Sequence, residues 1–348
     1  MTMPGIVWLR CCVHRTLLVL FALMLGVSGC GNEVESGRHI RIPLGAGGIG
    51  FLPLYVMRDR QLLEQHAAAQ GVDDLKVDWL DLGGPAAMND ALLSGAVDVI
   101  AAGPPAFLTL WDKTQGTLNV KGIAAISALP MYLNSRSPTF ASLDVISDRD
   151  KIALTSIKVS IPAIIMQMYA ADRFGAAEAE RFDRYTVSMA HPDGVIAMLS
   201  GTGDITAHFT SPPFHQREVR DASVQTILTS DQVMGGTTTF TMLSTTEAFL
   251  QANPELVAVI VTALSEAQEW ITREPAAAAE ILMRADGNAG LSKAEIAALL
   301  QDPAIVFSAT PANVMRYATF MHSIGSLKHL PESWQSLFVD DIHMLPGS

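Results

Sequence analysis

Cysteine and positive charge are both scarce in this sequence. Only three of the 348 residues are cysteine, at positions 11, 12 and 30, which excludes a small domain held together by disulfides. Lys and Arg number 23 against 35 Asp and Glu, and the formal net charge is −12. Because there is no basic stripe, a phosphate backbone would be repelled, and we expect no nucleic-acid partner.

Motifs that activate a catalytic group are also missing. The sequence has no G-x-S-x-G, no Walker loop, no H-E-x-x-H and no C-x-x-C. Gly45, Gly47 and Gly50 have the spacing of a dinucleotide loop, but no acidic residue stands at a strand end near residue 70. His208 and His215 form a close pair with no carboxylate between them, which is poor evidence for a metal site. We expect no enzymatic activity, no cofactor and no metal.

Apolar residues, in contrast, are abundant and evenly spread. They make up 49% of the chain, whereas charged residues make up 17%, a balance that excludes a disordered polyelectrolyte. A chain of this length can bury a sizeable core and form about two domains.

The N-terminal segment has the pattern of an export signal. Arg10 and Arg15 are the formal charges of residues 1–29, and they precede the apolar run Leu17–Leu25, which is short for a membrane span. Val27-Ser28-Gly29-Cys30 resembles the bacterial lipobox, in which the cysteine is lipidated after cleavage. We therefore predict a signal peptide over 1–29, lipidation of Cys30 and a polar tether over 30–38. An ordinary secretion signal and an uncleaved anchor are the alternatives.

The remainder alternates between short apolar strands, glycine-rich loops and helices. Strands are predicted over 40–44, 75–80, 97–102, 151–154 and 204–209. A helix is predicted from Pro53 to about Gln65, and another from Pro162 to about Phe174. From Pro254 onward the apolar period is 3.6 residues, which is helical. Strands and helices in this order predict an α/β fold with mainly parallel sheets.

Several short segments, in their order and spacing, resemble one known family. The chain is similar to the periplasmic solute-binding proteins of nitrate-, sulfonate- and taurine-type ABC importers, a family that also includes binders of thiamine-pyrimidine precursors. The likeness runs from about residue 39 to 325. It rests on Leu52–Tyr55, Gly83–Met88, Leu92–Asp98, Ala102–Pro105, Leu129–Met131, Asp150–Ala153 and Ser211–Phe214.

The resemblance implies a fold, a function and partners. The fold would be a two-lobed type II clamshell, each lobe a mainly parallel sheet flanked by helices, with two chain crossings at the hinge. Lobe 1 would comprise residues 39–131, lobe 2 residues 132–240, and residues 241–348 would return to lobe 1. The protein would be a monomer, lipid-anchored on the periplasmic or cell-surface side of a bacterial membrane. It would pass its solute to an ABC permease with a cytoplasmic ATPase.

Loops at the carboxyl ends of strands are where open α/β sheets bind ligands. The glycine loop 45–50 offers close backbone approach, and the hydroxyl-rich loop 155–160 offers polar groups. Ser160 equally fits a helix cap, and His208 equally fits a buried, hydrogen-bonded histidine. The candidate ligand-binding residues are Gly47, Gly48, Ile49, Gly103, Pro104, Pro130, Met131, Ser156, Lys158, Ser160, His208, Thr210, Ser211 and Gly235.

The class of solute stays open at this stage. The candidates are a sulfonate or another organic anion, a heteroaromatic or other neutral organic molecule, and inorganic nitrate or bicarbonate. Apart from Lys158, the candidate loops hold few donors for an anion, and burying an anion without donors is costly. A solute sensor that presents its ligand to a membrane receptor is an alternative function. A pyrimidine-synthase-like enzyme of the same fold is another, but the cysteine motif of those enzymes is absent here.

Overall fold

The computed structural model describes residues 38–201, 203–287 and 290–348. The predicted signal peptide and Cys30 lie outside the described residues. Residues His39–Ser348 group together as a unit separate from residues 1–38. Within the part described, none of the helices combines the length and the apolar character needed to cross a membrane.

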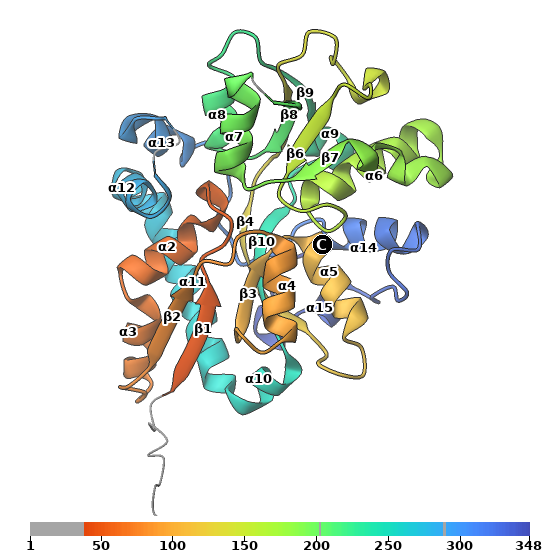
Figure 1. The fold of residues 1–348 in the computed structure, drawn as a ribbon. Coiled ribbons are helices and arrows are strands. Elements are labelled where there is room, and N and C mark those ends of the chain that lie inside the picture. The colour runs from red at the N-terminus through yellow and green to blue at the C-terminus, as the bar shows by residue number, and fades with distance from the viewer. Residues whose placement is uncertain (1–37, 202, 288–289) are drawn as a thin grey trace, which may run out of the picture. The chain divides into compact units, whose positions relative to one another are not determined.

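The strands of the first lobe form two small sheets. Strand β1 (His39–Pro43) pairs in parallel with β2 (Lys76–Leu80). Strand β10 (Thr239–Thr245) lies between β3 (Val99–Ala102) and β4 (Lys121–Ala128) and is antiparallel to both. All residues of β3 and β10 are buried, as expected for strands covered on both faces by helices (Figure 1).

Arg41 and Asp98 join the two small sheets. The Asp98 carboxylate accepts hydrogen bonds from the Arg41 backbone N–H at 2.8 Å, from Nε at 3.0 Å and from Nη2 at 2.7 Å. In return, the Asp98 backbone N–H donates to the Arg41 carbonyl oxygen at 3.0 Å. The carboxylate thus replaces part of the backbone ladder between β1 and β3.

The second lobe is built on one five-stranded sheet. Its order is β7 (Thr186–Ser188), β6 (Lys151–Leu154), β8 (Ile205–Thr210), β5 (Tyr132–Ser135) and β9 (Gln225–Thr229). Strand β6 is parallel to β7 and β8, and β5 is antiparallel to β8 and β9. In both lobes, therefore, the antiparallel strand is the one that enters from the other lobe.

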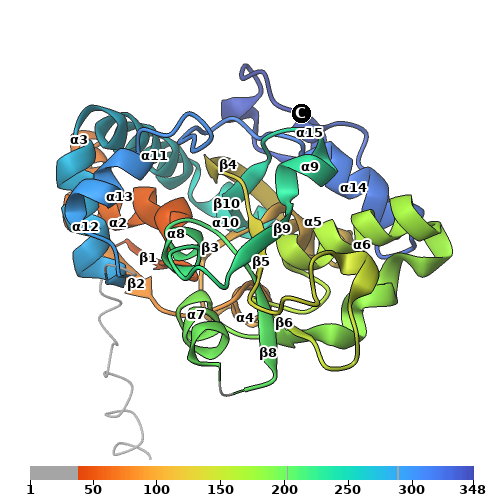
Figure 2. The same ribbon diagram turned by 90° about the horizontal axis from the view of Figure 1, so that it is seen from above.

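Helices flank the sheets of both lobes, as the predicted α/β class requires. Helix α11 packs against α2, α3 and β4, and α14 packs against α5 and α6 (Figure 2). The helices are α2 (Leu52–Asp59), α3 (Leu62–Ala69), α4 (Pro85–Leu93), α5 (Pro104–Lys113), α6 (Ile161–Phe174), α7 (His191–Ser200), α8 (Phe214–Glu218), α9 (Ser230–Met234), α10 (Glu247–Ala252), α11 (Pro254–Arg273), α12 (Pro275–Asp286), α13 (Lys293–Leu299), α14 (Val314–Ser323) and α15 (Trp334–Leu337).

Two predicted helices illustrate what local sequence can and cannot specify. Helix α6 has Ser160 as its N-cap and Pro162 in its first turn, and it ends at Phe174 as predicted. The helix predicted from Pro53 to Gln65 is instead two helices. Gln61 adopts a left-handed conformation with φ 51° and separates α2 from α3, a break that no glycine or proline marks.

The chain crosses between the two lobes at two neighbouring places. The first crossing, Leu129–Met131, joins β4 to β5, and the second follows β9 and α9 and ends where β10 begins at Thr239. The Met131 backbone N–H donates to Ser230 Oγ and the Ser230 backbone N–H donates to the Met131 carbonyl, both at 2.9 Å. The sequence predicts that the chain re-enters the first lobe at residue 241. In the structure, Thr239 already pairs with Ala128 of the first lobe, two residues earlier.

Asp98→Ala should destabilise the protein by about 2 kcal/mol, because it removes three hydrogen bonds to a charged acceptor from a half-buried strand junction. Asp98→Asn keeps an acceptor for the Arg41 backbone N–H and should cost about half as much. Urea unfolding measures both values. Equal stability of the wild type and Asp98→Ala would contradict the bridging role.

Candidate functional site

Residues of both lobes meet around a small inner cavity. Its volume is about 30 Å³, which is room for one or two water molecules. A second, outer cavity of about 400 Å³ shares Ala46 and Thr155 with the inner one. The inner cavity is lined by Ala46, Phe51, Pro85, Met88, Ala101, Ala102, Gly103, Met131, Thr155, Val159, Ser160, Ile161, Pro162, His191, Phe240 and Thr241.

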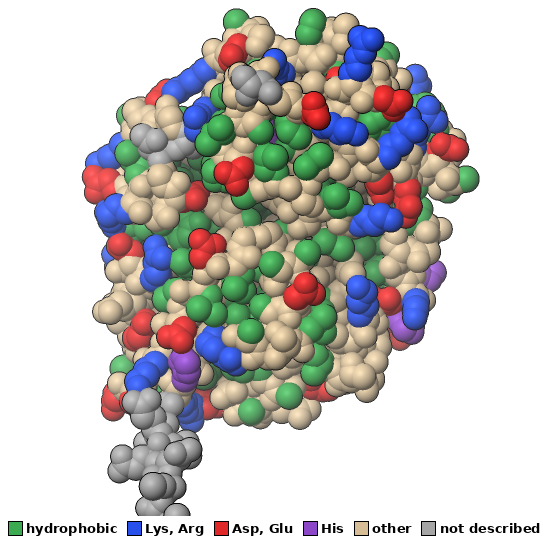
Figure 3. Space-filling model, viewed as in Figure 1, with side chains coloured by type: hydrophobic (Ala, Val, Ile, Leu, Met, Phe, Trp, Pro, Cys, Tyr) green, Lys and Arg blue, Asp and Glu red, His purple; other side chains and the backbone are tan. Residues whose placement is uncertain are grey.

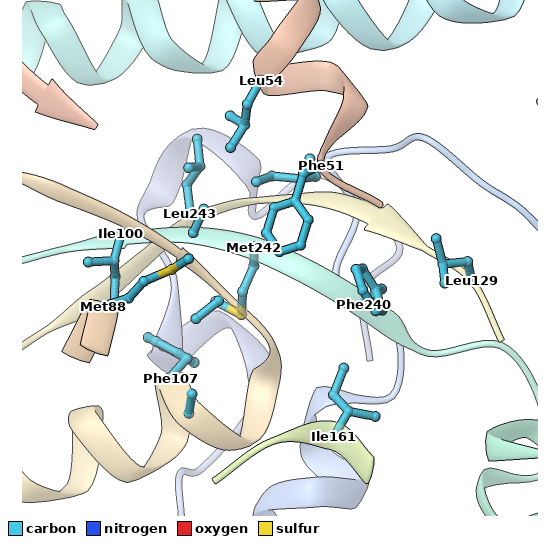
Figure 4. Packing of buried hydrophobic residues seen from close by; sticks show 14 of the residues in the cluster. Phe51, Leu54, Met88, Ile100, Phe107, Leu129, Ile161, Phe240, Met242 and Leu243 are labelled. Carbon is cyan, nitrogen blue, oxygen red and sulfur yellow. The ribbon is translucent and has the colours of Figure 1, made fainter. Parts of the chain in front are cut away.

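Apolar and aromatic side chains form most of the inner wall. Phe51 and Phe240 meet edge to face, with ring centroids 5.8 Å apart and an interplanar angle of 73°. Met88 comes from the first lobe, and Ile161 approaches from the start of α6 in the second (Figure 4). Such a wall suits a solute with an apolar or aromatic body.

The glycine loop permits this arrangement of rings. A Cβ atom on Gly45 would lie 1.9 Å from the Phe51 ring, and Gly45 has φ +93°. A Cβ atom on Gly47, at φ +89°, would lie 2.8 Å from Asp286 Oδ1. A side chain at either position would displace a group that lines one of the two cavities.

Carboxylates, rather than cations, stand at the outer cavity. Asp286 and Asp81 both line it, and neither cavity has a Lys or Arg among its lining residues. Burial raises the pKa of Asp286 to about 6; the hydrogen bond from the Gly48 N–H opposes this shift and the charge of Asp81 adds to it. Burial also raises the pKa of Tyr55 at the same cavity, so its hydroxyl stays protonated. Figure 3 shows hydrophobic side chains over much of the middle of one face.

A buried polar network lies behind His191. His191 Nδ1 is 3.1 Å from His208 Nε2 and 3.2 Å from Thr210 Oγ1. His208 Nδ1 is 2.6 Å from Glu218 Oε1, and Glu218 Oε2 accepts from Asn134 Nδ2 at 2.7 Å. These side chains are almost completely buried, and of the five residues only His191 lines a cavity.

Four of the predicted site residues line a cavity. Gly103, Met131 and Ser160 line the inner one and Gly47 the outer one. Ser160 also fulfils the alternative role, because its hydroxyl donates to the Ser156 carbonyl at 2.6 Å and caps α6.

The other predicted site residues lie beside or away from the cavities. His208 and Thr210 stand behind His191, and Lys158 is exposed, with Nζ 3.6 Å from Glu180 Oε2. Gly235 is the C-cap of α9 and lines neither cavity. Those that line neither cavity are Gly48, Ile49, Pro104, Pro130, Ser156, Lys158, His208, Thr210, Ser211 and Gly235.

Sequence reasoning missed His191 and Asp286. His191 begins α7 just after β7, so it stands at the carboxyl end of a strand and the strand-end rule could have found it. Asp286 ends α12, 238 residues from Gly48, and no local pattern links them.

Contacts across the cleft hold the two lobes together. The Ile49 N–H donates to the Pro212 carbonyl at 3.3 Å, and the Ala86 N–H donates to Ser156 Oγ at 3.5 Å. At the surface, Arg220 of the second lobe pairs with Glu295 of α13. The two lobes therefore touch each other at the cleft.

Comparison with known proteins identifies the fold. Residues 148–285 match the sequence model of the NMT1-like family. The alkanesulfonate-binding protein of Xanthomonas axonopodis pv. citri, bound to MOPS, superposes with a TM-score of 0.63 at 14% identity, over 84% of this chain and 95% of that one. The nitrate-binding protein of Synechocystis PCC 6803 gives a TM-score of 0.61 at 14% identity, over 84% and 83%.

A third similar structure is described by the name of its fold. A Candida albicans protein described as having the generic periplasmic binding protein fold gives a TM-score of 0.61 at 13% identity, over 84% of this chain and 91% of that one. This chain has the periplasmic-binding-protein fold. The two-lobed α/β architecture and the likeness to nitrate- and sulfonate-binding proteins are thereby confirmed at the level of fold. A search of curated proteins found no match to the sequence.

Asp286→Asn should stabilise the ligand-free protein at neutral pH. Between about pH 4 and 6 the folded protein holds a proton on Asp286 that the unfolded chain releases, so the free energy of unfolding falls as pH rises. Above pH 6 the ionised carboxylate therefore weakens the fold by on the order of 2 kcal/mol.

Thermal unfolding of wild type and Asp286→Asn at pH 4 and 7.5 measures this effect. The variant should melt higher at pH 7.5 and equally at pH 4. Asp341→Asn, at an exposed position, is the control and should change neither midpoint. A variant that melts lower than wild type at pH 7.5 would contradict the raised pKa.

Proposed function

We propose that this protein is the extracytoplasmic substrate-binding component of an ABC importer. The observation that supports this most directly is a cavity lined by residues of both lobes of a periplasmic-binding-protein fold. Proteins of this fold named for binding alkanesulfonate and nitrate support the same role. The solute would bind between the lobes, dissociate unchanged at a membrane permease, and undergo no reaction.

The lining of the inner and outer cavities best suits an uncharged or weakly basic organic molecule with an aromatic or apolar body. Phe51, Phe240 and Met88 supply an apolar wall, and the lining of both cavities offers no Lys or Arg. A sulfonate or nitrate would lose its hydration without gaining a counter-charge, and the carboxylates of Asp286 and Asp81 would repel it. Among the solute classes that the sequence leaves open, the apolar wall and the two carboxylates favour a heteroaromatic or neutral organic solute.

Closure supplies the binding mechanism. A ligand that touches both lobes stabilises the closed state relative to the open one, and it shifts the population accordingly. The Ile49–Pro212 and Ala86–Ser156 hydrogen bonds form only when the lobes meet. They therefore add to the closed state without touching the solute.

We further propose that the mature protein begins at Cys30, is lipidated there, and acts as a monomer on the outer side of a bacterial membrane. The basic flank, the short apolar run and the lipobox support this location. Cys30 is also the one cysteine left after cleavage at residue 29, and an acyl group would protect it from oxidation.

A thermal-shift panel tests the solute class. The panel would contain MOPS, taurine, nitrate, benzoate, cytosine and nicotinamide, added to the protein without residues 1–29. We expect a neutral heteroaromatic compound to raise the unfolding free energy by roughly 2.7 kcal/mol at 100 times its Kd, and the anions to have no effect. A shift by MOPS or nitrate alone would overturn the assignment of the solute. Recovery of the ligand unchanged would distinguish binding from catalysis.

Two buried phenylalanines provide the matched control. Phe240→Leu changes the cavity wall and should weaken binding of the shifting compound about tenfold. Phe338→Leu removes the same atoms from a core position outside both cavities and should leave the affinity unchanged. Equal losses in both variants would place the solute elsewhere.

Cys30→Ser should release the protein from membranes and abolish incorporation of labelled lipid. Membrane fractionation and metabolic labelling with a fatty acid measure these effects. The Cys11→Ser, Cys12→Ser double variant is the control and should remain anchored. Continued membrane retention of Cys30→Ser would instead support an uncleaved N-terminal anchor.

A further inference from the structure

The carboxylate of Glu218 is fully buried in the second lobe. Both Glu218 and His208 have 0% of their side chains exposed, and they are joined through Oε1 and Nδ1 at 2.6 Å. The second oxygen accepts a hydrogen bond from the neutral amide of Asn134. Among the described residues, no Lys or Arg pairs with this carboxylate. These groups lie where β8, α7 and α8 come together (Figure 1).

Charge balance restricts where the protons of this pair can sit. An unpaired charge is too costly to keep in such a site, so the Glu218–His208 pair is neutral overall. Two protonation states satisfy this condition: an ionised Glu218 with a doubly protonated His208, or a protonated Glu218 that donates to Nδ1 of a neutral His208. In both states, His208 Nε2 carries a proton.

That proton determines the tautomer of His191. His208 Nε2–H points to His191 Nδ1 at 3.1 Å, so Nδ1 acts as the acceptor. The hydroxyl of Thr210, 3.2 Å from the same nitrogen, can donate to it as well. Burial and the neighbouring His208 hold the pKa of His191 well below its usual value, so the ring is neutral. Its one proton is then on Nε2, which has no hydrogen-bond partner among the described residues.

We propose that Glu218 and His208 are positioning residues that lock His191 as the neutral Nε2–H tautomer, so that His191 offers a donor to a hydrogen-bond acceptor on the solute. The acceptor would be an uncharged carbonyl oxygen or an aromatic ring nitrogen. This inference rests on the proposed function, because it concerns the same cavity. Thr241 lines the cavity, and its buried hydroxyl has no hydrogen-bond partner among the described residues, so it can bind a second polar group of the solute.

A substitution at Gly194 can disturb the contact between His208 and His191 without changing any polar group of the network. A Cβ atom on Gly194 of α7 would lie 2.6 Å from His208 Nε2, so Gly194→Ala must push the His208 ring away from His191. Alanine also favours a helix over glycine by up to about 1 kcal/mol, so this variant should still fold.

Nitrogen NMR of the protein labelled with ¹⁵N-histidine reads the tautomer directly and needs no solute. The His191 signals are assigned by their loss in His191→Gln. We expect a protonated Nε2 and an unprotonated Nδ1 at pH 7. In Gly194→Ala, a population with the proton on Nδ1 should appear. A wild-type His191 that is doubly protonated or protonated on Nδ1 would overturn the proposal, and so would an unchanged spectrum in Gly194→Ala.

Glu218→Gln is the conservative variant that separates positioning from packing. Asn134 Nδ2 donates to one end of this side chain, which selects the Gln oxygen and turns its NH₂ toward His208 Nδ1. His208 Nε2 then keeps its proton, and the His191 signals should match those of the wild type. Glu218→Leu removes the donor–acceptor partner of His208 and should give both tautomers. Identical spectra for the Gln and Leu variants would overturn the role of Glu218.

Pyridine and benzene test recognition of an acceptor, because they differ in one ring nitrogen. We expect pyridine at pH 7.5 to shift the His191 Nε2–H proton signal and benzene at the same concentration not to do so. Equal shifts, or no shift with pyridine, would overturn the acceptor assignment. Because the tautomer is read in the absence of solute, these results stand apart from the thermal-shift panel, which tests the importer role.

Discussion

The reciprocal hydrogen bonds between Met131 and Ser230 join the first chain crossing to the start of α9, which leads into the second crossing, and much of the remaining architecture depends on this link. Because the crossings are neighbours, each lobe receives one strand from the other, β5 in the second and β10 in the first, and both run antiparallel to the strands beside them. The loops that end the parallel strands are thereby brought face to face. The position of the cavity therefore follows from the path of the backbone and does not depend on the chemistry of particular side chains.

The two cavities have no Lys or Arg among their lining residues, so other groups must balance the nearby carboxylates. The Glu218–His208 pair is neutral overall and lies one ring away from the cavity, so that of this network only the neutral His191 lines the cavity. Asp286 differs from Glu218 because it carries a negative charge at neutral pH, although burial raises its pKa to about 6. A deep neutral donor and an outer acceptor together describe a site for a polar but uncharged molecule.

The sequence predicted the fold class well because the signals for it are local. Proline at the start of α6, the 3.6 period of α11 and the glycine turns after strands each depend on a few adjacent residues. The break at Gln61 was missed because no glycine or proline marks it in the sequence. The site was harder still: Asp286 meets Gly48 across 238 residues, and His208 lies one layer behind the residue that lines the cavity. Whether the fourteen predicted residues bind a ligand stays a prediction.

The pairing of Arg220 with Glu295 links the lobes at the solvent-exposed rim, where each side chain is nearly half exposed. Ions in the medium screen such a pair, since the Debye length at physiological salt is about 8 Å. The hydrogen bond from the Ile49 N–H to the Pro212 carbonyl joins two buried, uncharged groups and is shielded from this effect. The ionic strength of the medium therefore acts on the contact between the lobes at its rim and has little effect on the buried part of the cleft.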